Sequence, residues 1–163
     1  MASVTLGKLR GRQMSPRAGI GYDGGDTFQG VAMLVRALLI LLGLFHILNG
    51  AFMLVAPGLW YTMVPGVIDT GPFNQHFVYD VGMAFAASGG MLVLAARAGR
   101  SAAILACAGA TWPALHALIH IEGWVTMGFP SDPQVAISEV VGVVALAAMG
   151  VALAWLRMKE QPA

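Results

Sequence analysis

Six side chains that could bind a metal ion or move protons lie near one end of the apolar segments of this chain. They are four histidines and two carboxylates: His46, His76, Asp80, His116, His120 and Glu139. Imidazole and carboxylate groups are the usual protein ligands of zinc, iron and copper. In membrane proteins the same groups also relay protons. The sequence therefore predicts a metal-binding or redox-associated site at this level of the molecule, and no feature selects proton handling over it.

The spacing of these residues arranges them in pairs. His76 and Asp80 are four residues apart, as are His116 and His120, so each pair shares one face of a helix. At a rise of 1.5 Å per residue, Asp80, His116 and Glu139 lie about 8–10 Å from the ends of their segments. Charged groups inside a membrane are costly and are expected to turn inward and pair. The expected inner ligands or acid–base groups are His46, Asp80, His116 and Glu139, and the expected outer ligands or access path are His76 and His120.

Several alternatives remain open for these residues. Two such pairs on facing helices could hold one or two transition-metal ions, as in di-metal helix bundles. A haem is a further alternative, with His46 and His116 as ligands from two helices, because His116 and His120 project from one face and could not both bind one iron. In the remaining alternative the polar layer only fixes helix packing, as in a non-catalytic accessory or assembly subunit of a membrane complex.

The composition indicates that lipid surrounds the elements that position these residues. The chain has 163 residues, of which 58% are hydrophobic and 10% charged. Soluble domains carry about a quarter charged residues, so an integral membrane protein is expected. The net charge of +1 gives no indication of a nucleic-acid partner. The single cysteine, Cys107, excludes an internal disulfide framework.

Four apolar stretches are long enough to cross a bilayer, which takes about 20 helical residues. They cover approximately residues 31–55, 77–96, 101–121 and 135–156. Backbone polar groups in lipid must bond within their own segment, so each stretch is expected to be a helix. The sequence thus predicts an all-α, four-transmembrane-helix bundle over residues 31–156. A disordered N-terminal tail (residues 1–30) and a C-terminal tail (residues 157–163) are expected to flank it.

The basic residues give this bundle an orientation. All lysines and arginines lie before or early in the first span, between the second and third spans, or after the fourth: Lys8, Arg10, Arg12, Arg17, Arg36, Arg97, Arg100, Arg157 and Lys159. The positive-inside rule therefore places both termini in the cytoplasm. The composition, rich in alanine and glycine, favours the inner membrane of a bacterium.

Small residues on the third span suggest a partner surface. Alanines recur every four residues: Ala98, Ala102, Ala106, Ala110 and Ala114. Such ladders let helix backbones approach closely. Ala114 lies about 200° around the helix from His116, so this face could meet a second copy or a partner membrane subunit. The alternative is that it packs on a neighbouring helix of the same chain.

The segment LLGLFHILNGAFMLVAPGLW (residues 41–60) contains Gly43 and Gly50 and ends in a Pro-Gly break. With the four-span layout and the long loop after the first span, it resembles the small bacterial membrane proteins of the DoxX-like group. The resemblance implies a four-helix fold. It also implies a link to redox or thiol biology as a partner subunit, which holds for some members of that group. It carries over no catalytic residue.

Overall fold

The computed structural model describes residues 24–97 and 99–160, and this part of the chain is helical and contains no strand. In chain order the elements are α1 (Gly24–Val55), α2 (Pro57–Met63), the 3-10 helix η1 (Val67–Thr70), α3 (Gln75–Ala95), α4 (Ala102–Met127), α5 (Pro133–Ile137), the π-helix η2 (Ser138–Ala145) and α6 (Leu146–Lys159). The last three elements are continuous, and we call them together the fourth span. The predicted all-α fold is confirmed for the described residues.

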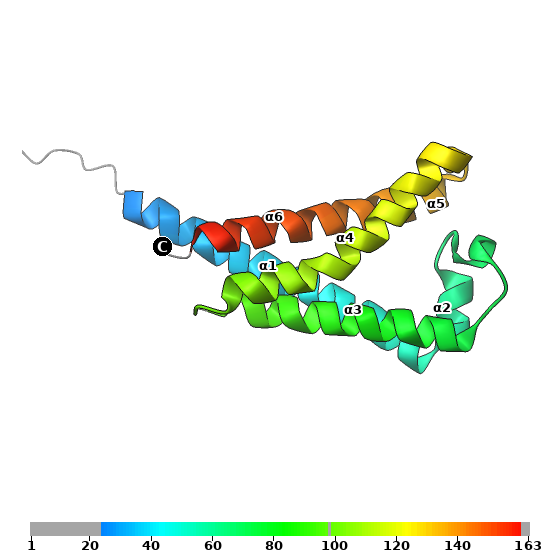
Figure 1. Ribbon diagram of the computed structural model, residues 1–163, viewed down its shortest axis with the longest axis horizontal. Helices are drawn as coiled ribbons and strands as arrows, with labels where there is room; N and C mark the ends of the chain where they lie inside the picture. The colour runs from blue at the N-terminus through cyan, green and yellow to red at the C-terminus, as the bar shows by residue number, and fades with distance from the viewer. Residues whose placement is uncertain (1–23, 98, 161–163) are drawn as a thin grey trace, which may run out of the picture.

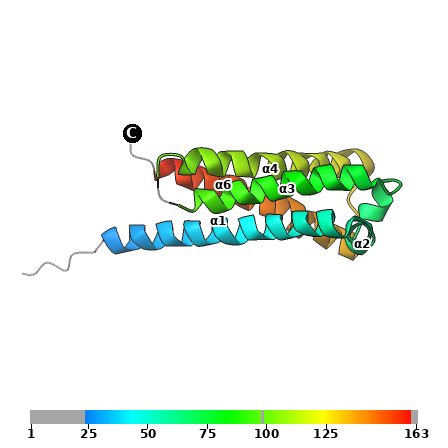
Figure 2. The ribbon, with the colours of Figure 1, turned by 90° about the horizontal axis from the view of Figure 1, so that it is seen from below.

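Four helices are long and apolar enough to cross a membrane: Thr27–Val55, Gln75–Ala95, Ala102–Met127 and Pro133–Lys159. They correspond to the four predicted spans. Figures 1 and 2 show α1, α3, α4 and α6 running along the long axis of the molecule as one bundle. The short helix α2 lies across one end of this bundle.

Several helix ends differ from the predicted bounds. The helix α1 begins at Gly24, so residues 24–30 are helical rather than part of a disordered tail, while residues 1–23 lie outside the described part. Six residues beyond the predicted end, α4 stops at Met127, where Gly128 takes a positive φ of 96°. The fourth span starts at Pro133, because the Asp132 carboxylate accepts hydrogen bonds from the next free backbone N–H groups.

A seam of four glycines joins α1 to α3. A Cβ atom added to Gly43 would lie 2.7 Å from the carbonyl oxygen of Gly89, and one added to Gly82 would lie 3.1 Å from that of Gly50. Gly43 and Gly50 are seven residues apart on α1, as are Gly82 and Gly89 on α3, and this spacing is about two helical turns. The two backbones therefore touch at two levels, and the helices run antiparallel with Gly43 opposite Gly89 and Gly50 opposite Gly82.

The main apolar core lies in the half of the bundle where α3 ends and α4 begins. Its buried residues come from all four spans: Val35, Leu39, Leu42, Leu92, Ala95, Ala96, Ala106, Ala110, Leu153 and Ala154. On α4, Ala102, Ala106 and Ala110 are buried, while Ala114 is half-buried and Ala98 lies outside the described part. The three buried alanines therefore pack against neighbouring helices of the same chain. The half-buried Ala114 lines an apolar groove beside α6, and a partner at this face stays a prediction.

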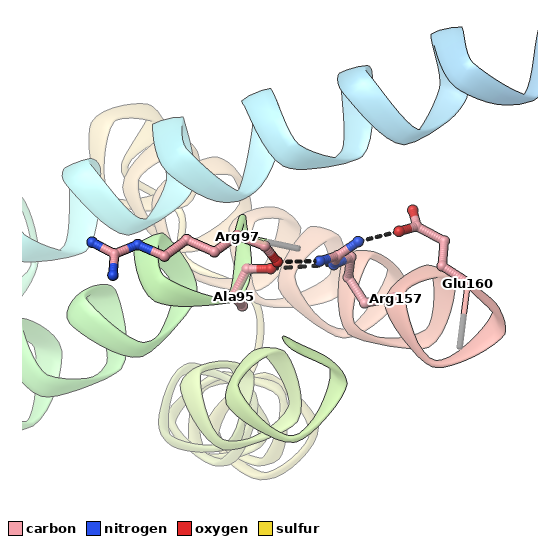
Figure 3. A network of polar contacts seen from close by, with 4 residues as sticks. All are labelled: Ala95, Arg97, Arg157 and Glu160. Atoms are coloured by element: carbon pink, nitrogen blue, oxygen red, sulfur yellow. Dashed lines mark hydrogen bonds and ion pairs between the residues drawn. The ribbon is translucent and has the colours of Figure 1, made fainter. Parts of the chain in front are cut away.

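Basic residues gather at the end of the bundle beyond this core, which we call the basic end: Arg36, Arg97, Arg100, Arg157 and Lys159. Arg157 is 2% exposed, so it is not part of a solvated tail as the predicted boundary at residue 157 implied. Its Nε donates to the carbonyl oxygen of Ala95 (3.2 Å) and its Nη2 to that of Arg97 (2.7 Å), while Nη1 pairs with Glu160 (Figure 3). The last carbonyls of a helix have no partner within that helix. Arg157, carried by α6, supplies donors to the end of α3.

The opposite end of the bundle, which we call the histidine end, has a second and smaller core. Met53, Val78 and Phe85 are buried there, with Trp60 and Trp112 packed against them. The indole Nε1 of Trp60 donates to Asn49 Oδ1 at 3.0 Å, which fixes α2 to α1. Phe85 and Trp112 of this smaller core contact two of the predicted site residues, His46 and His116.

Candidate functional site

Four ring side chains recur every four residues on α4: Trp112, His116, His120 and Trp124. The Trp112 and His116 rings stack, with centroids 6.0 Å apart and planes 15° apart. The His116 and His120 rings meet edge to face at 4.9 Å. The predicted sharing of one face by the two histidines is confirmed, and the tryptophans extend that face in both directions.

Glu139 connects this face to the fourth span. One carboxylate oxygen accepts a hydrogen bond from Trp124 Nε1 at 2.5 Å, and the other lies 3.3 Å from His120 Nδ1. Glu139 lies in the first turn of the π-helix η2, and wide turns of this kind are frequent at functional sites. The side chains of His120 and Glu139 are 24% and 20% exposed, so this pair is the accessible part of the site.

A phenyl ring and a buried histidine continue the arrangement toward α1. The ring of Phe85, on α3, contacts His116 with centroids 5.7 Å apart and His46 with centroids 5.4 Å apart. His46 is only 2% exposed. Both of its ring nitrogens, and Nε1 of Trp112, are buried without a hydrogen-bond partner in the described part of the chain. We call His46, Phe85, His116, His120 and Glu139 the histidine row; it crosses all four spans.

Two of the six predicted site residues lie apart from this row. His76 and Asp80 form the i,i+4 pair that their spacing predicts, at 3.7 Å, but their side chains are 88% and 54% exposed. They do not turn inward as predicted. Both lie in the first turns of α3, after the Asn74 cap, where their side chains lie outside the packed interior of the bundle.

The six residues do not form one ligand set in this structure. Among residues 24–97 and 99–160, no three His, Cys, Asp or Glu side chains are placed to hold one metal ion. The two histidines considered as haem ligands, His46 and His116, both contact the ring of Phe85. A haem between them would have to displace that ring. The geometry therefore favours an acid–base arrangement over a coordination sphere.

Part of the row consists of neighbouring groups that can each take up and release a proton. A neutral imidazole has one N–H donor and one bare nitrogen acceptor, so it can take up a proton at one position and release one at the other. Glu139 and His120 are in contact, and His116 is the next ring. Phe85 interrupts the polar groups before His46, so any transfer to His46 needs a bridging molecule.

Several members of this site were not predicted from the sequence. Trp124 and Trp112 were detectable, because they extend the four-residue spacing of the two histidines along α4. Phe85 carries no such signal, since an aromatic residue in an apolar span has no distinguishing feature.

Comparisons of the chain with protein-family models, with curated proteins and with solved structures give no match.

Proposed function

We propose that this chain is a redox-associated integral membrane protein whose histidine row exchanges protons with the aqueous side at the histidine end. The observation that carries the proposal is the contact from a partly exposed carboxylate, Glu139, through His120 to His116, directed toward the buried His46. The association with redox chemistry rests on the resemblance of residues 41–60 to the DoxX-like group.

The region beyond the row supports local proton exchange rather than transport across the membrane. Between His46 and Arg36, α1 carries no ionisable residue, and the same is true between Glu139 and Arg157 on the fourth span. The main apolar core, which includes Leu39, Leu92 and Leu153, fills this half of the bundle. Protons that enter at Glu139 therefore stay at the histidine end, where His120 and His116 can take them up.

Substituting Glu139→Gln is expected to change the protonation behaviour of His120 and His116 while leaving His76 unaffected. The amide keeps the size and an acceptor for Trp124 but removes the charge beside His120. The chain has four histidines, so ¹⁵N spectra of histidine-labelled protein in micelles, recorded over a pH series, can follow each of them. Stability should fall by only about 1 kcal/mol, as is usual for polar contacts between membrane helices.

Trp124→Phe is the matched control for this substitution. It removes the hydrogen bond that Glu139 accepts from Trp124 without changing any charge. Proton exchange through the row predicts that Glu139→Gln alters the titration of the two histidines and that Trp124→Phe does not. Unchanged His116 and His120 signals in the Glu139→Gln protein would rule out the proposed row.

A bound transition metal is a second version of the same proposal. Its support is that His116, His120 and Glu139 are side by side and are all metal-ligand types. Their present placement is not that of a ligand set, so metal binding requires these side chains to rearrange. Metal analysis and an optical spectrum of the untagged NMR sample distinguish the two versions, since stoichiometric zinc, iron or copper supports only the second.

An accessory subunit with a purely structural polar layer is the alternative function. It is favoured by the position of Glu139, which joins α4 to the fourth span, the least buried of the four spans. In that case both Glu139→Gln and Trp124→Phe would destabilise the protein, and Glu139→Gln would alter the protonation of His120, which Glu139 contacts, but not that of His116. The NMR comparison described above therefore also decides between these functions.

We further propose that both termini and the basic end face the cytoplasm of a bacterium. The support is the absence of lysine and arginine from residues 37–96 and 101–156. In a Cys107→Ala background, a membrane-impermeant maleimide should label Ser131→Cys in intact cells and Arg100→Cys only after permeabilisation. Ser131 and Arg100 are both exposed, so accessibility in the protein is matched. The reverse labelling pattern would invert the proposed orientation.

A further inference from the structure

The basic end carries more positive charge than its neighbours neutralise. Of its five cations, Arg157 pairs with Glu160. Lys159 lies over the ring of Trp155, 4.0 Å from its centre. Within the described residues, Arg36, Arg97 and Arg100 have no carboxylate partner. An uncompensated group of guanidinium groups at the end of a helix bundle is suited to an anion.

The glycine seam places Arg36 at the end of α3. Because Gly43 lies opposite Gly89 and the helices are antiparallel, moving seven residues from each reaches Arg36 on α1 and Ala96 on α3. Arg97 is the next residue after Ala96. Arg36, within α1, and Arg97, just after α3, therefore lie at about the same level of the bundle, where their like charges repel unless an anion lies between them.

Neither of these two side chains has an anionic partner among the described residues. The Nε of Arg36 is buried and has no hydrogen-bond partner among the described residues. The backbone carbonyl of Arg97 accepts from Arg157, but the Arg97 side chain points away from Arg157 (Figure 3) and is exposed. A guanidinium that lacks a partner retains its fork of N–H donors, which matches two oxygens of a phosphate group.

We propose that Arg36 and Arg97 bind a phosphate oxyanion, supplied by the headgroup of an anionic phospholipid at the basic end. The surface beside them favours a lipid over free phosphate. Ile40, one turn from Arg36 on α1, is 40% exposed, and Leu94, one turn before the end of α3, is 42% exposed. Along the bundle axis, both apolar side chains lie nearer to the middle of the bundle than the arginines do. The acyl chain of a bound lipid would run in that direction. This site is separate from the histidine row and does not depend on its function.

The test is a lipid titration of the full-length protein in a mild non-ionic detergent, followed by native mass spectrometry. Phosphatidylglycerol should bind about tenfold more tightly than phosphatidylcholine. Each of Arg36→Gln and Arg97→Gln should weaken phosphatidylglycerol binding by about fivefold. The double variant should bind the two lipids equally. Arg36→Lys keeps the charge but loses the fork, so its affinity should fall between that of wild type and Arg36→Gln.

Arg100→Gln is the matched control, because it removes one exposed charge from the same connection as Arg97 and lies beyond the level of Arg36. Wild-type binding by this variant supports the site. A loss equal to that of Arg36→Gln would show diffuse attraction to net charge and would overturn the site, as would equal binding of the two lipids by the wild type. Displacement of phosphatidylglycerol by inorganic phosphate would support the oxyanion site and assign it to a soluble source. Size-exclusion profiles confirm that each variant is folded. If the double variant does not fold, the comparison of wild type, Arg36→Lys and Arg36→Gln still tests the site.

Discussion

Replacing Gly89 by alanine is expected to destabilise the bundle by about 2–3 kcal/mol, the upper range for overpacking a closely packed contact. The added methyl group would meet the carbonyl oxygen of Gly43 and, at 2.8 Å, the backbone nitrogen of Ile47. Backbone atoms of a helix cannot move aside as a side chain can. The only relief is therefore to separate α1 from α3, which weakens their contact along its whole length.

Gly90 provides the matched control one residue away. A Cβ atom at Gly90 would have no heavy atom of another element within 4 Å. Alanine favours a helix over glycine by up to about 1 kcal/mol in water, so Gly90→Ala should be neutral or slightly stabilising. Unfolding of both variants by SDS in mixed micelles measures the difference. Equal midpoints for Gly89→Ala and Gly90→Ala would contradict the close approach at the seam.

Replacing Arg157 by methionine is the second substitution with a large expected effect, a loss of about 2–3 kcal/mol. The methionine retains much of the volume, but the carbonyl oxygens of Ala95 and Arg97 lose their donors. Glu160, which is 17% exposed, loses its counter-charge. Removing one partner of a buried charged contact is costly because the other groups remain desolvated.

Two further variants test this explanation for Arg157. Adding Glu160→Gln to Arg157→Met should recover about 1 kcal/mol, because the unpaired carboxylate is then neutral. Lys159→Met removes a neighbouring charge that is exposed and contacts only the Trp155 ring, so it should lower stability by less than about 1 kcal/mol. SDS unfolding and thermal denaturation in detergent measure all three. Similar losses for Lys159→Met and Arg157→Met would mean that charge at the basic end, rather than the contacts of Arg157, determines stability.

The sequence predicts the spans well because hydropathy and length are local properties. The end of α1 at Val55 agrees with the predicted bound, as does the existence of all four helices. The residues of α2 were predicted only as part of the long loop after the first span. It begins with Pro57 at a position that favours a helix start, yet its seven residues are too few to give a periodic signal. The π-helix η2 was not predicted either, since its sequence is that of any apolar helix.

The glycine seam shows why packing could not be predicted from the same information. Gly43 and Gly50 were visible in the sequence, but their partners Gly82 and Gly89 are identified only when the register of α1 on α3 is known. The i,i+4 pairing of His76 with Asp80 follows from one helix and is confirmed. The failure of that pair to face inward depends on how α3 is rotated against its neighbours. The role of Arg157 as a partner for α3 depends on two helices that are far apart in sequence.

The position of Arg157 also determines the order in which this bundle can be completed during synthesis. The chain emerges from the ribosome in sequence order, so α1 and α3 can join through their glycines before α4 and α6 exist. Arg157 follows Ala95 by 62 residues. Throughout that interval the last carbonyls of α3 lack the donors that Arg157 later supplies. A nascent chain that stops just before Arg157 already contains nearly all of the apolar helices but not the contact that closes them, so assembly of the bundle is finished only when the end of α6 is made.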